Sequence, residues 1–285
     1  MKIRLGGHGL PIDSSDPFAF ARAHRAFGYG AAYVPEVTLA DGQRLADIEA
    51  AFAAEDVVLA EIGIWRNLIA PEPDIRKRHL AYAIERLAIA DEVGALCAVS
   101  YIGTFAPGSD YTPDARNFGA EAFELTVETA RHIIDAVRPR RARFALEMMQ
   151  YSLPDSVDSY LELLKAIDRP AFAAHIDPVN LIMTPRVYFE NGALIRECFE
   201  KLGPHIVSCH AKDIQVHKRA ALHFDEVPIG EGVLDYATYL TELARLPREV
   251  PLMLEHLEPA QYAAGRDAIH AAGRAAGVGF VVEPK

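Results

Sequence analysis

The stretch "AFAAHIDPVN" (residues 171–180) contains the pattern on which the prediction of the fold depends. It begins with small and apolar residues, as expected of a strand that is buried on both faces, and then places His175 and Asp177 before Pro178. Burying an unpaired carboxylate costs several kcal/mol. Asp177 therefore needs a cation, a hydrogen-bond network or an opening to solvent.

Short apolar or β-branched segments alternate with amphipathic helical patterns along the whole chain. The helix predicted over 74–94, for example, has Leu80, Ile84 and Leu87 at spacings of three and four, and Gly94 ends it. This alternation predicts βα units. The eight predicted strands cover residues 2–7, 31–37, 57–65, 95–103, 143–149, 172–177, 206–213 and 251–257.

Eight strands of this kind predict an α/β protein in which residues 1–285 form a single-domain (β/α)8 TIM barrel. An open, doubly wound sheet would also alternate strand and helix, but it usually has a glycine fingerprint after its first strand, and "LGGHGL" (5–10) does not match G-x-G-x-x-G. In a barrel, the active site is expected at the carboxyl ends of the strands.

The composition excludes several classes of protein. The net charge of −11 disfavours a nucleic-acid partner, and no apolar run approaches the roughly 20 residues that span a bilayer. The first residues turn polar too early for a secretory signal, so we expect a cytoplasmic protein with no membrane partner. Cys97, Cys198 and Cys209 lie far apart in apolar contexts, which predicts reduced core residues.

The last four predicted strands each end with a side chain that can bind a metal: Glu147, Asp177, His210 and Glu255. A single carboxylate at a strand end is often a helix cap or a salt-bridge partner, but three that converge would repel one another unless a divalent ion were present. We therefore predict one metal ion. The donor set of three carboxylates and one imidazole suits Mn²⁺ best, then Mg²⁺ or Co²⁺, and Zn²⁺ less well.

The segments "LEMM" (146–149), "HIDPVN" (175–180), "CHAKD" (209–213) and "LEHL" (254–257) resemble the metal-ligand segments of the xylose isomerase-like (β/α)8 barrels. That superfamily includes sugar isomerases, ketose 3-epimerases, inosose dehydratases and endonuclease IV. The resemblance implies that Glu147, Asp177, His210 and Glu255 hold the ion, with Glu147 and Glu255 as the catalytic acid/base pair.

The chain also departs from the family. It has Asn180 where epimerases and endonuclease IV commonly have a histidine, and Val216 where the epimerases have a substrate-binding arginine.

Five further residues near the strand ends are predicted to bind substrate: Lys212, His8, Trp65, Asn180 and His175. Alternatives remain for three of them: a salt bridge to Asp213 for Lys212, packing under a loop for Trp65, and a supporting or purely structural role in the core for His175. The insertion over 217–236 resembles the substrate-covering loop of the family, although it can also be an ordinary surface excursion, and 102–119 is a second candidate for the rim.

We therefore expect a divalent-metal-dependent isomerase or epimerase of carbohydrate metabolism, which acts on a ketose or keto-sugar derivative through an enediolate. The main alternative is a metal-dependent lyase, either a dehydratase or a decarboxylase. A DNA-repair nuclease like endonuclease IV would need extra histidines on the early strands, for a trinuclear zinc cluster, and a basic face for phosphates, and the sequence shows neither. The resemblance also allows a homodimer or a homotetramer.

Overall fold

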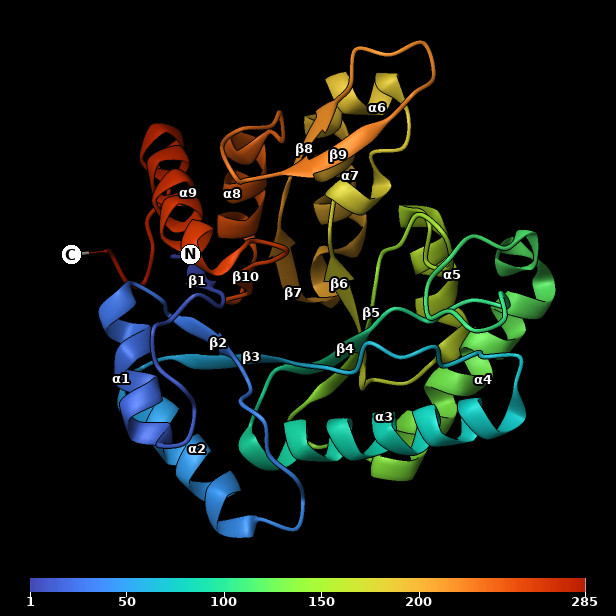
Figure 1. Cartoon of the computed structure of the whole chain (residues 1–285), viewed down its shortest axis with the longest axis horizontal. Helices are drawn as coiled ribbons and strands as arrows, with labels where there is room; N and C mark the ends of the chain where they lie inside the picture. The colour runs from blue at the N-terminus through green and yellow to red at the C-terminus, as the bar shows by residue number, and fades with distance from the viewer. Residues whose placement is uncertain (285) are drawn as a thin grey trace.

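Eight parallel strands close into a barrel in the computed structural model, which describes residues 1–284 (Figure 1). The hydrogen-bonded order is β1-β10-β7-β6-β5-β4-β3-β2, so the barrel closes where β1 pairs with β10. Each predicted strand segment contains one barrel strand, which confirms the predicted (β/α)8 architecture. The barrel strands are β1 (Arg4–Gly6), β2 (Ala31–Tyr33), β3 (Val58–Gly63), β4 (Cys97–Ser100), β5 (Arg143–Glu147), β6 (Phe172–Ile176), β7 (Ile206–Ala211) and β10 (Pro251–Leu254).

Helices surround the barrel (Figure 1). The helix predicted over 74–94 is confirmed as α3, and Gly94 caps its end with a left-handed φ of 72°, a conformation that costs glycine little. The helix α5 begins one residue after Ser156, whose side chain accepts from the backbone N–H of Ser159. The helices are α1 (Pro17–Phe27), α2 (Gly42–Ala54), α3 (Pro73–Val93), α4 (Ala120–Val137), α5 (Val157–Ile167), α6 (Pro185–Phe189), α7 (Asn191–Leu202), α8 (Tyr236–Arg245) and α9 (Tyr262–Ala276).

Side chains alternate between the interior of the barrel and the layer beneath the helices. Phe144 and Leu146 of β5 belong to the large core cluster outside the barrel, whereas Ala145 packs with Cys97 and Val99 inside it. This alternation directs the next odd-numbered residue of β5, Glu147, into the interior. All three cysteines are buried and free of disulfides, as predicted.

The region after β7 differs from the prediction. The expected loop over 217–236 contains β9 (Phe224–Val227), which forms an antiparallel hairpin with β8 (Asp213–Val216), the strand just before the loop. The hairpin packs against α6 through Phe224 and Tyr188 (orange and yellow in Figure 1). The Asp213 carboxylate accepts four backbone N–H groups, from Ile214, Gly230, Gly232 and Leu234, and so folds the segment after β9 back onto β8.

Because Asp213 is occupied in this way, the alternative salt bridge between Lys212 and Asp213 is wrong.

Within residues 1–284, no helix combines the length and the apolar character needed to cross a membrane.

Candidate metal centre

The structure brings together the four side chains that were predicted as metal ligands. Glu147 ends β5, Asp177 follows β6, His210 lies in β7 and Glu255 follows β10. One potential ligand atom from each residue lies within 4.8 Å of the others. The parallel register explains this convergence, because adjacent barrel strands present their inward side chains at the same level, as in the pairing of Met253 with His210.

His210 lies at the centre of the cluster. Its Nδ1 is 2.7 Å from Oε1 of Glu147, 3.0 Å from Oε2 of Glu255 and 3.9 Å from Oδ2 of Asp177. Asp177 is fully buried, and its other oxygen, Oδ1, accepts from the backbone N–H of Val179 at 3.0 Å. The buried carboxylate of Asp177 is thus stabilised in part by a local hydrogen bond and in part by basic neighbours.

Lys212 is the second basic neighbour. Its side chain is buried, and Nζ lies 2.9 Å from Oδ2 of Asp177 and 3.0 Å from Oε2 of Glu255. Within the described chain, these two carboxylate oxygens are buried and accept no hydrogen bond of good geometry, so they remain as acceptors that point into the cluster. Three carboxylates and one imidazole with such open acceptors fit a divalent cation.

Burial and neighbouring charges shift the pKa values of these groups in opposite directions. Burial raises the pKa of Asp177 to about 6, although Lys212 opposes the shift. Burial would also raise the pKa of Glu255, but His210 and Lys212 hold it well below its usual value. Burial alone would lower the pKa of His210, yet the neighbouring Glu255 and Glu61 carboxylates raise it. The centre is therefore rich in negative charge that basic groups only partly balance.

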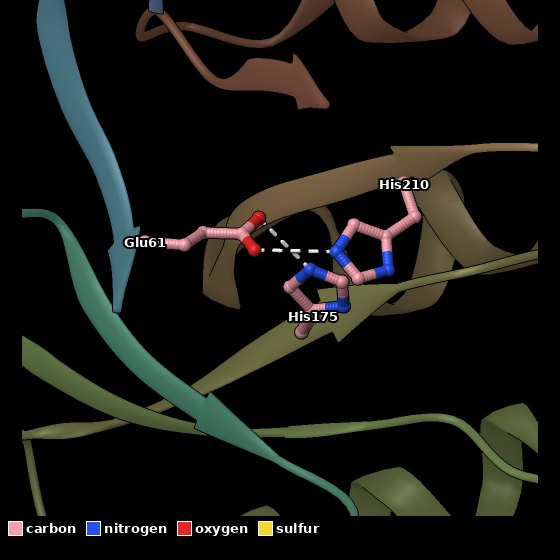
Figure 2. Close-up of side chains that lie close together, drawn as sticks. All are labelled: Glu61, His175 and His210. Carbon is pink, nitrogen blue, oxygen red and sulfur yellow. Dashed lines mark hydrogen bonds and ion pairs between the residues drawn. The ribbon is translucent and has the colours of Figure 1, made fainter. Parts of the chain in front are cut away.

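Sequence reasoning missed Glu61, a fully buried residue of β3. Its Oε1 accepts from Nε2 of His175 at 3.1 Å, and its Oε2 accepts from Nε2 of His210 at 3.2 Å (Figure 2). The hydroxyl of Ser208 also donates to Oε1. Burial would raise the pKa of Glu61, but His210 and His175 lower it. The available signal was a lone acidic residue in the otherwise apolar strand "VVLAEIGIW" (57–65).

The position of His175 corrects one prediction. His175 is fully buried beneath the cluster, and its ring lies edge-on against the ring of His210, with 4.2 Å between centroids. It faces Glu61 and is not part of the cavity wall (Figure 2). His175 was predicted to bind substrate, but at this depth it supports other side chains.

A cavity of about 620 Å³ opens above the four predicted ligands. Its wall includes Glu147 and Glu255 together with the other four residues predicted to bind substrate: His8, Trp65, Asn180 and Lys212. Tyr111, from the predicted rim segment 102–119, lines it as well. The residues that sequence reasoning missed are Tyr101, Met149, Gln150, Glu226, His256 and Tyr262.

Two of the missed residues form a pair across the cavity mouth. Glu226 reaches the cavity from β9, and its Oε2 lies 2.7 Å from Nδ1 of His256, while its Oε1 lies 3.6 Å from Nζ of Lys212. Because Glu226 belongs to the hairpin, the hairpin is part of the site, as the predicted covering loop would be.

His256 and Trp65 both have positive φ values, of 55° and 46°, which non-glycine residues adopt rarely and mostly where the surroundings enforce it.

The fold and these side chains define a class of protein: a (β/α)8 barrel with an acidic, histidine-containing centre at the carboxyl ends of its strands. The family model of the xylose isomerase-like TIM barrel matches residues 20–272, and the chain belongs to this family. This confirms the resemblance inferred from the four segments. No protein with curated annotation matches the sequence.

Several solved structures share the fold. A xylose isomerase domain protein from Planctomyces limnophilus is 19% identical, with a TM-score of 0.69, and the match covers 97% of this chain and 98% of that one. A xylose isomerase-like TIM barrel protein from Mycobacterium smegmatis, solved in complex with magnesium, is 17% identical, with a TM-score of 0.66 and coverage of 96% and 97%.

D-psicose 3-epimerase from Clostridium cellulolyticum H10, solved with D-tagatose, is 14% identical, with a TM-score of 0.64 and coverage of 96% of both chains. At these identities, the three likenesses show the shared fold alone.

Proposed function

We propose that the protein is a divalent-metal-dependent isomerase or epimerase that acts on a ketose or keto-sugar derivative. The observation that carries this proposal is the placement of Glu147 and Glu255. Both carboxylates line the cavity, and both approach Nδ1 of His210, at 2.7 and 3.0 Å. A substrate carbon held between them would be within reach of two proton-transfer groups.

Glu147, Asp177, His210 and Glu255 would hold the ion, for which Mn²⁺ is the first choice and Mg²⁺ or Co²⁺ the next. When bound, the ion would supply Lewis-acid polarisation of a substrate carbonyl and its neighbouring hydroxyl. The magnesium reported for the Mycobacterium smegmatis relative is consistent with a hard divalent ion in this fold.

The reaction then depends on the side chains of this chain. One glutamate, ionised, takes the proton from the carbon next to the carbonyl, and the electron pair of that C–H bond forms the C=C bond of an enediolate. The other glutamate, protonated, returns a proton to the opposite face of the same carbon, which gives the epimer. Return to the neighbouring carbon, together with transfer of the hydroxyl proton from the second oxygen to the first, gives the isomer. The two carboxyl groups exchange protonation states in each turnover.

The cavity wall supports a small, hydroxylated substrate. A volume of about 620 Å³ lies within the range of small-molecule sites. Gln150, Asn180 and Glu226 supply hydrogen-bonding groups along the wall, and Trp65 supplies an apolar surface that excludes water. Lys212 lies where it would stabilise negative charge on a substrate oxygen.

A lyase is the second candidate, and one observation favours it. Nδ1 of His256 contacts Glu226 at 2.7 Å on the cavity wall, and this hydrogen bond raises the pKa of His256. A protonated imidazole there would be a suitable acid for a leaving hydroxyl in a dehydration. The epimerase proposal requires no such acid.

The test is hydrogen exchange in D₂O, followed by NMR, over a panel of keto-sugars and sugar acids. The chain should be stripped with chelator and reloaded with Mn²⁺, Mg²⁺ or Co²⁺. His217, His223 and Asp225 form a separate group of possible ligands on the hairpin, away from His210. The protein should therefore carry His217→Gln and His223→Gln when bound metal is counted.

Deuterium incorporation with inversion supports an epimerase, and transfer to the neighbouring carbon supports an isomerase. Loss of water or CO₂ supports the lyase. Failure to bind any of the three ions, or absence of exchange over the whole panel in the loaded protein, would overturn the proposal.

A further inference from the structure

Glu61 lies one layer below the proposed metal ligands and has no contact with the cavity. Three polar side chains converge on its carboxylate: His175 and Ser208 on Oε1, and His210 on Oε2. The three come from β6 and β7, across the barrel interior from β3 (Figure 2). A fully buried carboxylate needs partners of this kind, because desolvating it otherwise costs several kcal/mol.

The hydrogen bonds fix where the protons are. An ionised carboxylate accepts only, so the Nε2 atom of His210 that faces Oε2 of Glu61 at 3.2 Å must carry a proton. In the neutral ring, Nδ1 then has the free lone pair. That same Nδ1 faces Glu147 and Glu255, on the side where the ion would bind. Glu61 and the proposed ion thus lie on opposite edges of one imidazole.

The backbone of the barrel is irregular at this cluster. The β2–β3 register shifts between Ala32 and Tyr33, which places Tyr33 opposite Glu61. The β6–β7 register shifts between Ala174 and His175, which places His175 opposite Ser208. Such irregularities redirect side chains and are frequent near functional sites. Both register shifts occur next to Glu61 or to one of the residues that contact its carboxylate.

His175 restrains the same ring from below. Its imidazole lies edge-on to that of His210, at an interplanar angle of 72° and a centroid distance of 4.2 Å. With Nε2 of His210 held by Glu61 and its face covered by His175, the imidazole of His210 is restricted in both rotation and tautomer. A ligand restrained in this way needs little reorganisation to bind an ion.

We propose that Glu61 is a positioning residue that holds His210 with Nε2 protonated and with Nδ1 directed at the divalent ion. This inference rests on the proposed metal centre and adds to it a residue outside the ligand set. Substrate does not reach Glu61, so the effect is exerted through His210.

Glu61→Gln gives a directional test. The side-chain oxygen that replaces Oε1 is held by two donors, His175 and Ser208, so the amide NH₂ should take the place of Oε2 and face Nε2 of His210. A donor at that point favours the other tautomer, with the proton on Nδ1. The Mn²⁺ affinity, measured by the EPR signal of free Mn²⁺, should fall roughly 10- to 100-fold.

Ser208→Ala is the matched control, because it disturbs the same buried carboxylate without touching His210. Its Mn²⁺ affinity should equal that of the wild type. The second readout is long-range ¹H–¹⁵N NMR of the diamagnetic Mg²⁺ form, with the His210 signals identified by their loss in His210→Asn. The wild type should show a proton on Nε2 and none on Nδ1, and a proton on Nδ1 would overturn the inference even if Glu61→Gln does not fold.

The outcomes are separable. If the wild type binds no divalent ion, the metal centre itself fails, and the role of Glu61 fails with it. If the wild type binds Mn²⁺ and folded Glu61→Gln binds it equally well, only the inference about Glu61 is overturned. A wild-type Mg²⁺ form with the proton on Nδ1 of His210 would also overturn it. An equal loss of affinity in Ser208→Ala and Glu61→Gln would indicate general damage to the cluster, and would refute a specific action through His210.

Discussion

Lys212 offers the sharpest test of the charge balance at the centre, through the substitution Lys212→Met. Its ammonium lies 2.9 and 3.0 Å from oxygens of Asp177 and Glu255, and its side chain is only 3% exposed. At an effective dielectric constant of about 20, each contact has a gross Coulomb attraction of about 5 kcal/mol. Burial of the ammonium offsets part of this attraction, and breaking a buried ion pair by removing one partner typically costs about 3–5 kcal/mol. We expect that loss in the free energy of unfolding of the metal-free protein.

A divalent ion should reverse part of the loss, because it supplies positive charge to the same carboxylates. Because Lys212→Met leaves these carboxylates without a competing cation, the variant should bind Mn²⁺ more tightly than the wild type, and each tenfold gain in affinity reduces the deficit by about 1.4 kcal/mol at a saturating ion concentration. The assay is urea denaturation of both proteins at pH 8, above the pKa of about 6 of Asp177, once with chelator and once with Mn²⁺. The deficit of the variant should shrink when Mn²⁺ is present.

Lys201→Met is the matched control. Lys201 also pairs with two carboxylates, Asp158 at 2.8 Å and Glu197 at 2.7 Å, but it does so at the surface. Its removal should change stability very little, because solvent screens exposed pairs. Equal effects of Lys201→Met and Lys212→Met would refute the reasoning. So would a stability deficit in Lys212→Met that Mn²⁺ leaves unchanged.

Three further predictions concern catalysis, packing and pH. Glu255→Gln should retain the fold but lose turnover, and full activity in the exchange assay would remove the acid/base assignment. Tyr160→Phe removes the hydroxyl that donates to the carbonyls of Leu146 and Ala173 and accepts from the N–H of His175, so the free energy of unfolding, measured in urea, should fall by about 1–3 kcal/mol. Burial lowers the pKa of His24 from 6.5 to about 4, so the unfolded chain binds the extra proton between these values, and stability is lost as the pH falls through this window. This contribution amounts to about 3 kcal/mol, and urea unfolding at pH 7 and pH 4.5 should show a smaller loss in His24→Gln than in the wild type.

The fold was predictable because its signals are local. A buried parallel strand such as "AFAAHID" is apolar over consecutive residues, and amphipathic helices such as α3 and α5 have their own periodicity and caps. The hairpin β8–β9 was not predictable in the same way. Its strands are short and largely polar, and they are held by Asp213, whose acceptors are filled by backbone groups up to 21 residues away. A contact of that kind leaves no periodic trace in the sequence.

The candidate site was also predictable only in part. The convergence of Glu147, Asp177, His210 and Glu255 followed from their positions at the ends of consecutive strands, which any (β/α)8 barrel brings together. Glu61 was missed because its partners lie 114 to 149 residues away, and a single buried acid in a strand does not identify them. For His175, the sequence correctly indicated a place near the strand end and allowed a supporting role in the core, but the depth at which its ring faces Glu61 depends on a register shift that the sequence does not indicate.

The two departures from the family concern neighbouring features of the site. Where the epimerases have an arginine, the side chain of Val216 packs against the core, and its backbone N–H donates to the hydroxyl of Tyr188 at 3.2 Å. Position 216 therefore contributes no cation to the cavity wall. Lys212 provides one instead, and Nζ lies 3.4 Å from Oδ1 of Asn180, the residue that replaces the family's histidine. A histidine at 180 would place a third basic group beside Lys212 and His210. The two replacements are therefore compatible with one another: the cavity wall has a cation at Lys212, and the uncharged amide of Asn180 beside it adds no like charge.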